Sequence, residues 1–387
     1  MKQVKILFVI FLSLFSLALA SCVPGGTQPA QGWSGATFNN DILYLGSADG
    51  KVMAVNSATR SLEWSYAIVT PSSGGMSCGR TSAPAAIYGT PVVDGDLVYI
   101  GAYAGKVLAL STSARSQGLS FPQRRSGEWL YPAKSGEAIG GIVGSLAVGE
   151  HAIYAASSNG KVYSLDKDFG DLNWESDVLG EKLWTTPVIQ DDAVYISTFD
   201  GHIYALSTSD GSQLWAFKAD QGFVSSPVLY KDTIFVGSFS RNLYAIKIGN
   251  NEPLWKFPGG NWFWATPVVS DDVVYAGCLD GKIYAISYWT GEQLWAFDAK
   301  SPIVSSPVFM GDLLVVAAES GDIYVFDTGA KPEDKQLMPV KVISIDAPIR
   351  GSLCVQGGVV YVRAQDNCLY ALDIQKGWVS WKLPLTI

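Results

Sequence analysis

The chain has 387 residues, of which 48% are hydrophobic and only 16% are charged, so it can bury a large core and lacks the composition of a disordered protein. Its formal net charge of −8 argues against nucleic acid or anionic lipid as a direct ligand, because both are negatively charged. The 40 glycines and 13 tryptophans are typical of short strands, tight turns and aromatic packing.

The first 21 residues have the composition of an export signal. Lys2 and Lys5 form a short positive segment, and an apolar stretch follows over residues 6–19. The sequence Leu19-Ala20-Ser21-Cys22 resembles the cleavage site of bacterial lipoproteins, whose cysteine is acylated and becomes the first residue. We therefore predict a lipoprotein signal peptide over residues 1–21 and lipidation of Cys22.

Residues 22–32 are rich in glycine and proline and are expected to form a flexible tether after the lipidated cysteine. The apolar stretch of the signal is short for a membrane span, and no later part of the chain has 18 consecutive apolar residues. We expect the mature protein to be exported and anchored to a bacterial membrane by its lipid rather than to span it.

From residue 33 to residue 387 the chain consists of repeats of about 40 residues. A four-residue motif marks their register at Ile203-Tyr204-Ala205-Leu206, Leu243-Tyr244-Ala245-Ile246, Ile283-Tyr284-Ala285-Ile286 and Ile323-Tyr324-Val325-Phe326. Weaker copies begin at Val52, Val107, Val162 and Leu369. The sequence thus contains eight repeats.

Each repeat is expected to form four short strands. In the sixth, these are residues 267–269, residues 273–277, the motif-bearing strand and a strand containing Trp295-Ala296-Phe297. Asp280-Gly281 between the second and third strands predicts a two-residue hairpin turn. Such units bury both faces only by stacking around an axis, so we predict an all-β, eight-bladed propeller of four-stranded antiparallel blades. Ring closure either juxtaposes blades 1 and 8 or exchanges a strand between them.

The segment from Ala285 to Trp295 closely resembles the tryptophan-docking repeat of quinoprotein-type (PQQ-like) propellers. In that family the tryptophans pack between neighbouring blades. The resemblance therefore implies a structural docking role for Trp64, Trp129, Trp174, Trp215, Trp255, Trp295 and Trp381. An insertion delays Trp129 in blade 2, and blade 7 has residues 332–339 in place of a docking tryptophan.

Quinone dehydrogenases of this family hold their cofactor on the propeller axis with calcium, a catalytic aspartate and a pair of adjacent cysteines. The present chain has no adjacent cysteines, its aspartates lie mostly in hairpin turns, and it has no C-x-x-C-H haem motif. His151 and His202 are its only histidines, and we interpret both as surface residues. We expect no cofactor, no metal site and no enzymatic activity.

Four cysteines remain after Cys22, and their spacing matches neither a metal site nor a redox motif: Cys78, Cys278, Cys354 and Cys368. Cys354 and Cys368 fall on the first and third strands of blade 8, about 10 Å apart, which is too far for a disulfide. Cys78 lies in the long loop 69–87. We expect buried thiols.

A candidate interaction surface emerges from the residues three places before the first-strand proline or its counterpart. These residues are Trp33, Tyr88, Val143, Trp184, Val224, Trp264, Val304 and Arg350. The predicted interaction rim consists of Trp33, Tyr88, Trp184, Trp264 and Arg350, with Trp262 and Phe263 beside it, because aromatics and arginine dominate binding hot spots. The alternative is that these side chains plug the central funnel. Insertions 69–87 and 111–128 are further candidates.

The lipoprotein signal, tether and eight blades together resemble the BamB family of outer-membrane assembly lipoproteins. The resemblance implies a monomeric, non-catalytic scaffold on the periplasmic side of the outer membrane, which binds a barrel-assembly factor and its client proteins. Two other functions remain open: a periplasmic redox protein that binds PQQ or another small ligand, and a carbohydrate- or surface-binding module.

Overall fold

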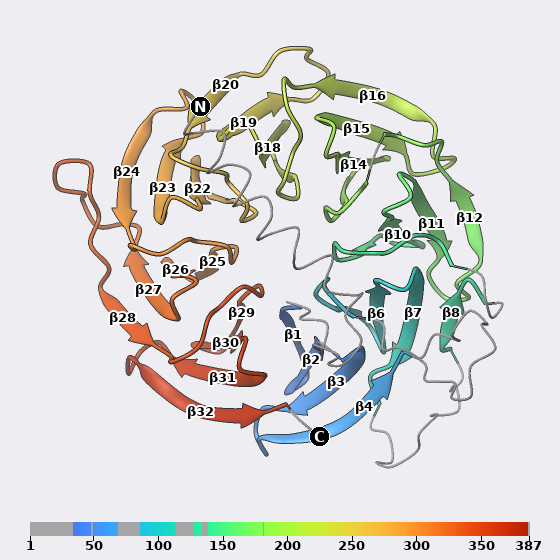
Figure 1. The fold of residues 1–387 in the computed structure, drawn as a ribbon, viewed down its shortest axis with the longest axis horizontal. Helices are drawn as coiled ribbons and strands as arrows, with labels where there is room; N and C mark the ends of the chain where they lie inside the picture. Colours follow the sequence, from blue (N-terminus) through green and yellow to red (C-terminus); the bar gives the residue numbers. More distant parts are fainter. Residues whose placement is uncertain are drawn as a thin grey trace, which may run out of the picture.

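The computed structural model describes residues 34–47, 49–68, 86–113, 127–133, 138–180 and 182–385. Within these ranges every regular element is a strand, and the 32 strands form eight four-stranded sheets. The sheets stand radially around a central axis (Figure 1). The prediction of an all-β, eight-bladed propeller is confirmed.

The predicted signal, Cys22, the tether, Trp33, Cys78 and most of both insertions lie outside the described residues. The first four blades are β1 (Ala36–Asn39), β2 (Ile42–Gly46), β3 (Lys51–Asn56), β4 (Ser61–Ala67); β5 (Val92–Asp94), β6 (Leu97–Ala102), β7 (Lys106–Ser111), β8 (Trp129–Tyr131); β9 (Ala147–Val148), β10 (Ala152–Ala156), β11 (Val162–Asp166), β12 (Leu172–Glu175); and β13 (Val188–Gln190), β14 (Ala193–Ser197), β15 (His202–Ser207), β16 (Gln213–Lys218).

The last four blades are β17 (Val228–Tyr230), β18 (Thr233–Gly237), β19 (Asn242–Lys247), β20 (Trp255–Pro258); β21 (Val268–Ser270), β22 (Val273–Gly277), β23 (Lys282–Ser287), β24 (Gln293–Asp298); β25 (Val308–Met310), β26 (Leu313–Ala317), β27 (Asp322–Asp327), β28 (Lys341–Ser344); and β29 (Cys354–Gln356), β30 (Val359–Arg363), β31 (Cys368–Asp373), β32 (Trp378–Pro384). In every blade the strands neighbour one another in chain order, from the axis outward.

The hydrophobic core lies between blades rather than within them. Strand residues alternate between the two faces of a sheet, so each blade contributes to two clusters, one with each neighbour. The cluster between blades 8 and 1 includes Leu45 and Met53 from one side and Tyr361 and Leu369 from the other. The ring therefore closes by face-to-face packing, and each terminal blade keeps its own four strands.

The tryptophan of the outermost strand contacts the next blade in a recurring geometry. In blade 5 the Trp255 indole N–H donates to the carbonyl of Tyr288 in blade 6, at 2.7 Å. Gly291 leaves room for the ring, since a Cβ there would lie 2.6 Å from Trp255 Cγ. Trp129 and Trp174 donate in the same way to the next blade, at 2.9 Å in both cases.

Blades 4 and 7 depart from this geometry. The buried indole nitrogen of Trp215 in blade 4 has no acceptor among the described residues, and the next blade has Asn251 at the position that aligns with Gly291. In blade 7, Lys341 of the fourth strand pairs with Val325 of the third. The docking tryptophans occupy the same place in their blades, as Trp295 does opposite Ala285. The Lys341 ammonium group donates to the carbonyl of Ile374 at 2.8 Å, the position that the indoles reach elsewhere. A lysine thus occupies the docking position of blade 7.

Candidate interaction surface

Two kinds of connection meet at one end of each blade, here called the mouth: the segment that leads into the first strand and the hairpin between the second and third strands. They coincide because alternate antiparallel strands begin and end at the same edge. A backbone bond joins them repeatedly, from Phe239 N–H to the Gly222 carbonyl at 2.8 Å and from Leu279 N–H to the Trp262 carbonyl at 2.9 Å. Side chains on the two connections are therefore held next to each other.

Four aromatic rings at the mouth form a continuous row across blades 4, 5 and 6. The Trp184 and Phe199 centroids are 5.0 Å apart, those of Phe199 and Phe239 are 5.5 Å apart, and those of Phe239 and Trp262 are 5.0 Å apart. All three pairs are edge-to-face, a favourable arrangement for aromatic quadrupoles. Each ring is half-buried. This aromatic row is a rigid, partly exposed surface.

The remaining predicted rim residues have local partners or stand apart. Tyr88 contacts Tyr103 edge-to-face at 5.4 Å, and Arg350 forms an ion pair with Glu319 at 2.5 Å. Trp264 is half-buried. Of the predicted rim residues that the structure describes, only Trp184 belongs to the aromatic row.

Sequence reasoning missed the hairpin residues Phe199, Phe239 and Tyr103, because it compared only the segments leading into the first strands. Aligning the turns between the second and third strands would have found them, since they occupy equivalent positions. The placement of Phe263 beside the rim was wrong: its side chain is fully buried in the cluster between blades 5 and 6. Its neighbour Trp262 points to the mouth and contacts Phe239.

The aromatic row carries polar groups suited to a protein partner. The Lys182 ammonium lies 5.5 Å from the centre of the Trp184 ring, within cation–π range. The Trp184 indole nitrogen is buried and has no acceptor among the described residues. The exposed Lys182 cation beside the row favours a partner that brings a carbonyl or carboxylate.

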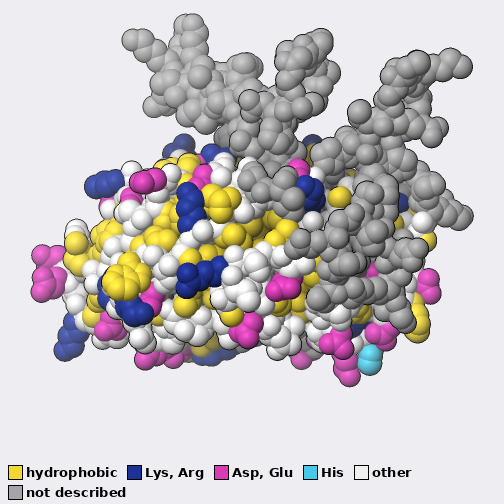
Figure 2. All heavy atoms as spheres, turned by 90° about the horizontal axis from the view of Figure 1, so that it is seen from below, with side chains coloured by type: hydrophobic (Ala, Val, Ile, Leu, Met, Phe, Trp, Pro, Cys, Tyr) yellow, Lys and Arg dark blue, Asp and Glu magenta, His cyan; other side chains and the backbone are white. Residues whose placement is uncertain are grey.

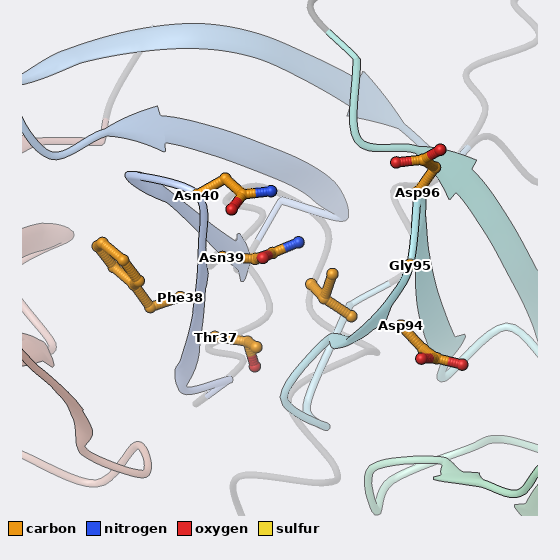
Figure 3. A pocket seen from close by; sticks show the side chains of 8 residues that line it. Thr37, Phe38, Asn39, Asn40, Asp94, Gly95 and Asp96 are labelled. Atoms are coloured by element: carbon orange, nitrogen blue, oxygen red, sulfur yellow. The ribbon is translucent and has the colours of Figure 1, made fainter.

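A polar cleft lies at the opposite end of blades 1 and 2, between the turns at residues 37–40 and 93–96 (Figure 3). Its volume is about 400 Å³. Asn40 of blade 1 lies across from Asp96 of blade 2. The equivalent residues are Lys231 of blade 5 and Asp272 of blade 6, which form an ion pair. Asn40 is neutral and therefore cannot form such an ion pair with Asp96. Acidic side chains are frequent along the lower rim of the ring in Figure 2.

The chemistry of the described residues gives little support to catalysis. Burial raises the pKa of the Cys278 thiol to about 12 and that of Cys354 to about 11, so neither is a ready nucleophile. In the described part of the chain no three His, Cys, Asp or Glu side chains are arranged to hold a metal ion. The same residues contain no helix long and apolar enough to cross a membrane. His202 lies beside Asp200, at 3.1 Å.

A family model described as outer membrane protein assembly factor BamB matches residues 24–129, 115–256, 218–331 and 280–386. The BamB protein of Bordetella pertussis is 28% identical over 185 residues, covering 48% of this chain and 43% of that protein. The BamB protein of Shewanella oneidensis is 22% identical over 190 residues, which cover 49% of this chain and 43% of that protein. Each match thus spans less than half of the relative's length.

Solved structures resemble the whole propeller. BamB from Moraxella catarrhalis superposes with a TM-score of 0.65 at 19% identity, covering 87% of this chain and 92% of that one. The computationally designed Ika8 protein reaches a TM-score of 0.66 at 17% identity, covering 89% and 97%. Because one neighbour is a natural assembly factor and the other is designed, this likeness establishes the fold alone.

Proposed function

The chain belongs to the outer membrane protein assembly factor BamB family, and from that premise we propose that it is a non-catalytic, lipid-anchored scaffold that assists outer-membrane protein assembly. The observation that carries the proposal is the family match from residue 24 to residue 386. Relatives with significant similarity over nearly half of the chain are named for the same role.

The aromatic row, together with Lys182, is the proposed docking surface for the protein partner. Trp is enriched in binding hot spots and Phe in interfaces generally, and a preformed row loses little conformational entropy on binding. The proposed partner is a barrel-assembly factor, and its client proteins bind in the same complex. The predicted rim residues Tyr88, Trp264, Arg350 and Trp33 are proposed to extend this surface around the mouth.

Export and lipidation of Cys22 are part of the proposal. Residues 1–21 would be removed, the acylated Cys22 would hold the protein at the periplasmic side of the outer membrane, and residues 22–32 would tether the propeller at residues 33–387. The proposed mature form is a monomer without a cofactor. The raised thiol pKa values and the relatives' naming as assembly factors support a non-catalytic role.

Cross-linking in native membranes tests the proposal. A photoreactive amino acid replaces Phe239 in the aromatic row and, as a control, the 68% exposed Trp289 at the opposite end of the strands. We expect mass spectrometry to identify a barrel-assembly factor cross-linked through position 239 and not through position 289. Capture of no assembly component, or equal capture at both positions, would refute the proposed surface.

A further inference from the structure

Four consecutive blades carry an exposed aliphatic residue at one position of the outer wall, directly before the docking position. These residues are Leu214, Leu254, Leu294 and Val340, with exposed fractions of 58%, 49%, 40% and 54%. The other four blades have polar residues there: Ser380, Glu63, Glu128 and Asn173. At this position, the outer wall is therefore apolar in blades 4 to 7 and polar in blades 8, 1, 2 and 3. Exposed apolar residues that recur at equivalent positions indicate a contact surface rather than scattered exposure.

The outer edge of blade 6 is already occupied by a segment of the chain itself. The Ala296 N–H, which points away from the sheet, donates to the carbonyl of Lys335 at 3.0 Å, and Ala296 forms a parallel bridge with Gln336. Leu337 then enters the core cluster that contains Trp295. In Figure 1 the loop between β27 and β28 passes beside β24. An outer strand of this propeller therefore accepts a main-chain partner.

Blade 4 presents the same edge without an occupant. β16 begins Gln213-Leu-Trp-Ala-Phe, and β24 begins with the same five residues. Ala216 pairs with Tyr204 as Ala296 pairs with Tyr284, so its N–H also points outward. Among the described residues no segment bonds to it. The unpaired Trp215 indole N–H lies on the same strand.

We propose that the outer edge of β16 binds an extended segment of a partner polypeptide by main-chain hydrogen bonds, with Leu214 and Leu254 contacting its apolar side chains. Strand addition to an exposed edge takes its affinity from main-chain bonds and its selectivity from alternate side chains. A polypeptide with apolar side chains at alternate positions fits this edge, since those side chains can contact the exposed leucines beside it. The inference rests on the proposed function as a scaffold for polypeptides.

A peptide-binding experiment with the purified full-length protein tests the inference. The probe is a fluorescein-labelled ten-residue peptide of alternating Val and Thr, and its twin carries N-methyl groups on alternate residues. We expect fluorescence anisotropy to show binding of the first peptide and at least tenfold weaker binding of the twin, which cannot form one row of main-chain bonds. Equal binding of both peptides would overturn the proposal.

Two variants locate the site, each with a matched control on the polar half of the wall. Ala216→Pro removes the outward N–H, which an edge strand tolerates, and Ser65→Pro makes the equivalent change in blade 1. We expect Ala216→Pro to weaken peptide binding at least tenfold and Ser65→Pro to leave it unchanged. Leu214→Glu is expected to weaken binding, and Ser380→Glu is not.

Thermal unfolding of each variant shows whether weaker peptide binding comes from a change at the edge of β16 or from unfolding of the whole propeller. If Ala216→Pro unfolds, Leu214→Glu still tests the proposal, because that side chain is exposed and its replacement leaves the backbone intact. Unchanged binding in a folded Leu214→Glu variant would overturn the assignment to β16. Cross-linking through Phe239 at the mouth is a separate readout, so failure at this edge and failure of the proposed function are distinguishable.

Discussion

At the residue scale, the docking tryptophans differ in whether the indole N–H finds an acceptor in the next blade. Trp255 donates to the Tyr288 carbonyl at 2.7 Å, whereas the Trp215 nitrogen is buried without an acceptor among the described residues. Leaving a buried carbonyl unsatisfied costs about 1–3 kcal/mol. We therefore expect Trp255→Phe to lower the free energy of unfolding by about 1–2 kcal/mol more than Trp215→Phe does. Urea denaturation measures both, and equal losses would contradict this explanation.

A second prediction at the residue scale concerns the glycine that lies against each docked indole ring. Gly291 has φ of +71°, and a Cβ there would meet Trp255 Cγ at 2.6 Å, whereas Gly311 has φ of +59° and open space around its Cβ position. Both alanine variants pay about 1 kcal/mol for the left-handed backbone. Gly291→Ala should cost about 1–3 kcal/mol more, because the indole must move. Equilibrium unfolding of the two variants is the measurement, and indistinguishable stabilities would show that the ring adjusts freely.

At the element scale, blade 7 substitutes a lysine for the tryptophan that links one blade to the next. The Lys341 ammonium reaches the Ile374 carbonyl at 2.8 Å and also donates to Gln375. Removal of this donor in Lys341→Met should lower the free energy of unfolding by about 1–3 kcal/mol, since the carbonyls lose a charged partner. Lys300→Met is the control: that lysine is 82% exposed and pairs with Asp298 on the surface, so we expect a change below about 0.5 kcal/mol.

The same blade shows where sequence reasoning was sufficient and where it was not. The register of the repeats predicts the strands because each unit repeats its apolar pattern, and blades 1, 4 and 6 also share an Asp-Gly turn. The lysine link was not predictable, since a lysine at the start of a strand carries no signal until the strand register places it opposite Val325. The aromatic row was missed for a related reason: Trp184 and Phe199 belong to different connections, and only the fold makes them neighbours.

At the scale of the whole molecule, the ring depends on the junction between blades 8 and 1. Seven blades have Gly, Ala or Ser at equivalent positions at the end of the second strand or one residue before it: Gly46, Gly101, Ala156, Ser197, Gly237, Gly277 and Ala317. All four of these glycines lie against an apolar residue of the following blade, as Gly277 does against Ile303. Blade 8 has Arg363 instead, and its side chain is only 6% exposed. The junction that closes the ring therefore contains a buried cation.

Burial lowers the pKa of Arg363 to about 10, and its Nε and Nη1 atoms have no acceptor among the described residues. Below about pH 10 the pH is lower than the pKa of Arg363 in both the folded and the unfolded chain, so the guanidinium is charged in both states. The full cost of burying its charge therefore applies at neutral pH. We expect Arg363→Met to raise the free energy of unfolding by about 1–3 kcal/mol at neutral pH, since a methionine fills the site without burying charge. Arg350→Met, which breaks the ion pair with Glu319, should instead lower it by up to about 1 kcal/mol. Urea denaturation at pH 7 distinguishes these opposite signs. A loss in Arg363→Met would mean that the buried guanidinium stabilises the closed ring.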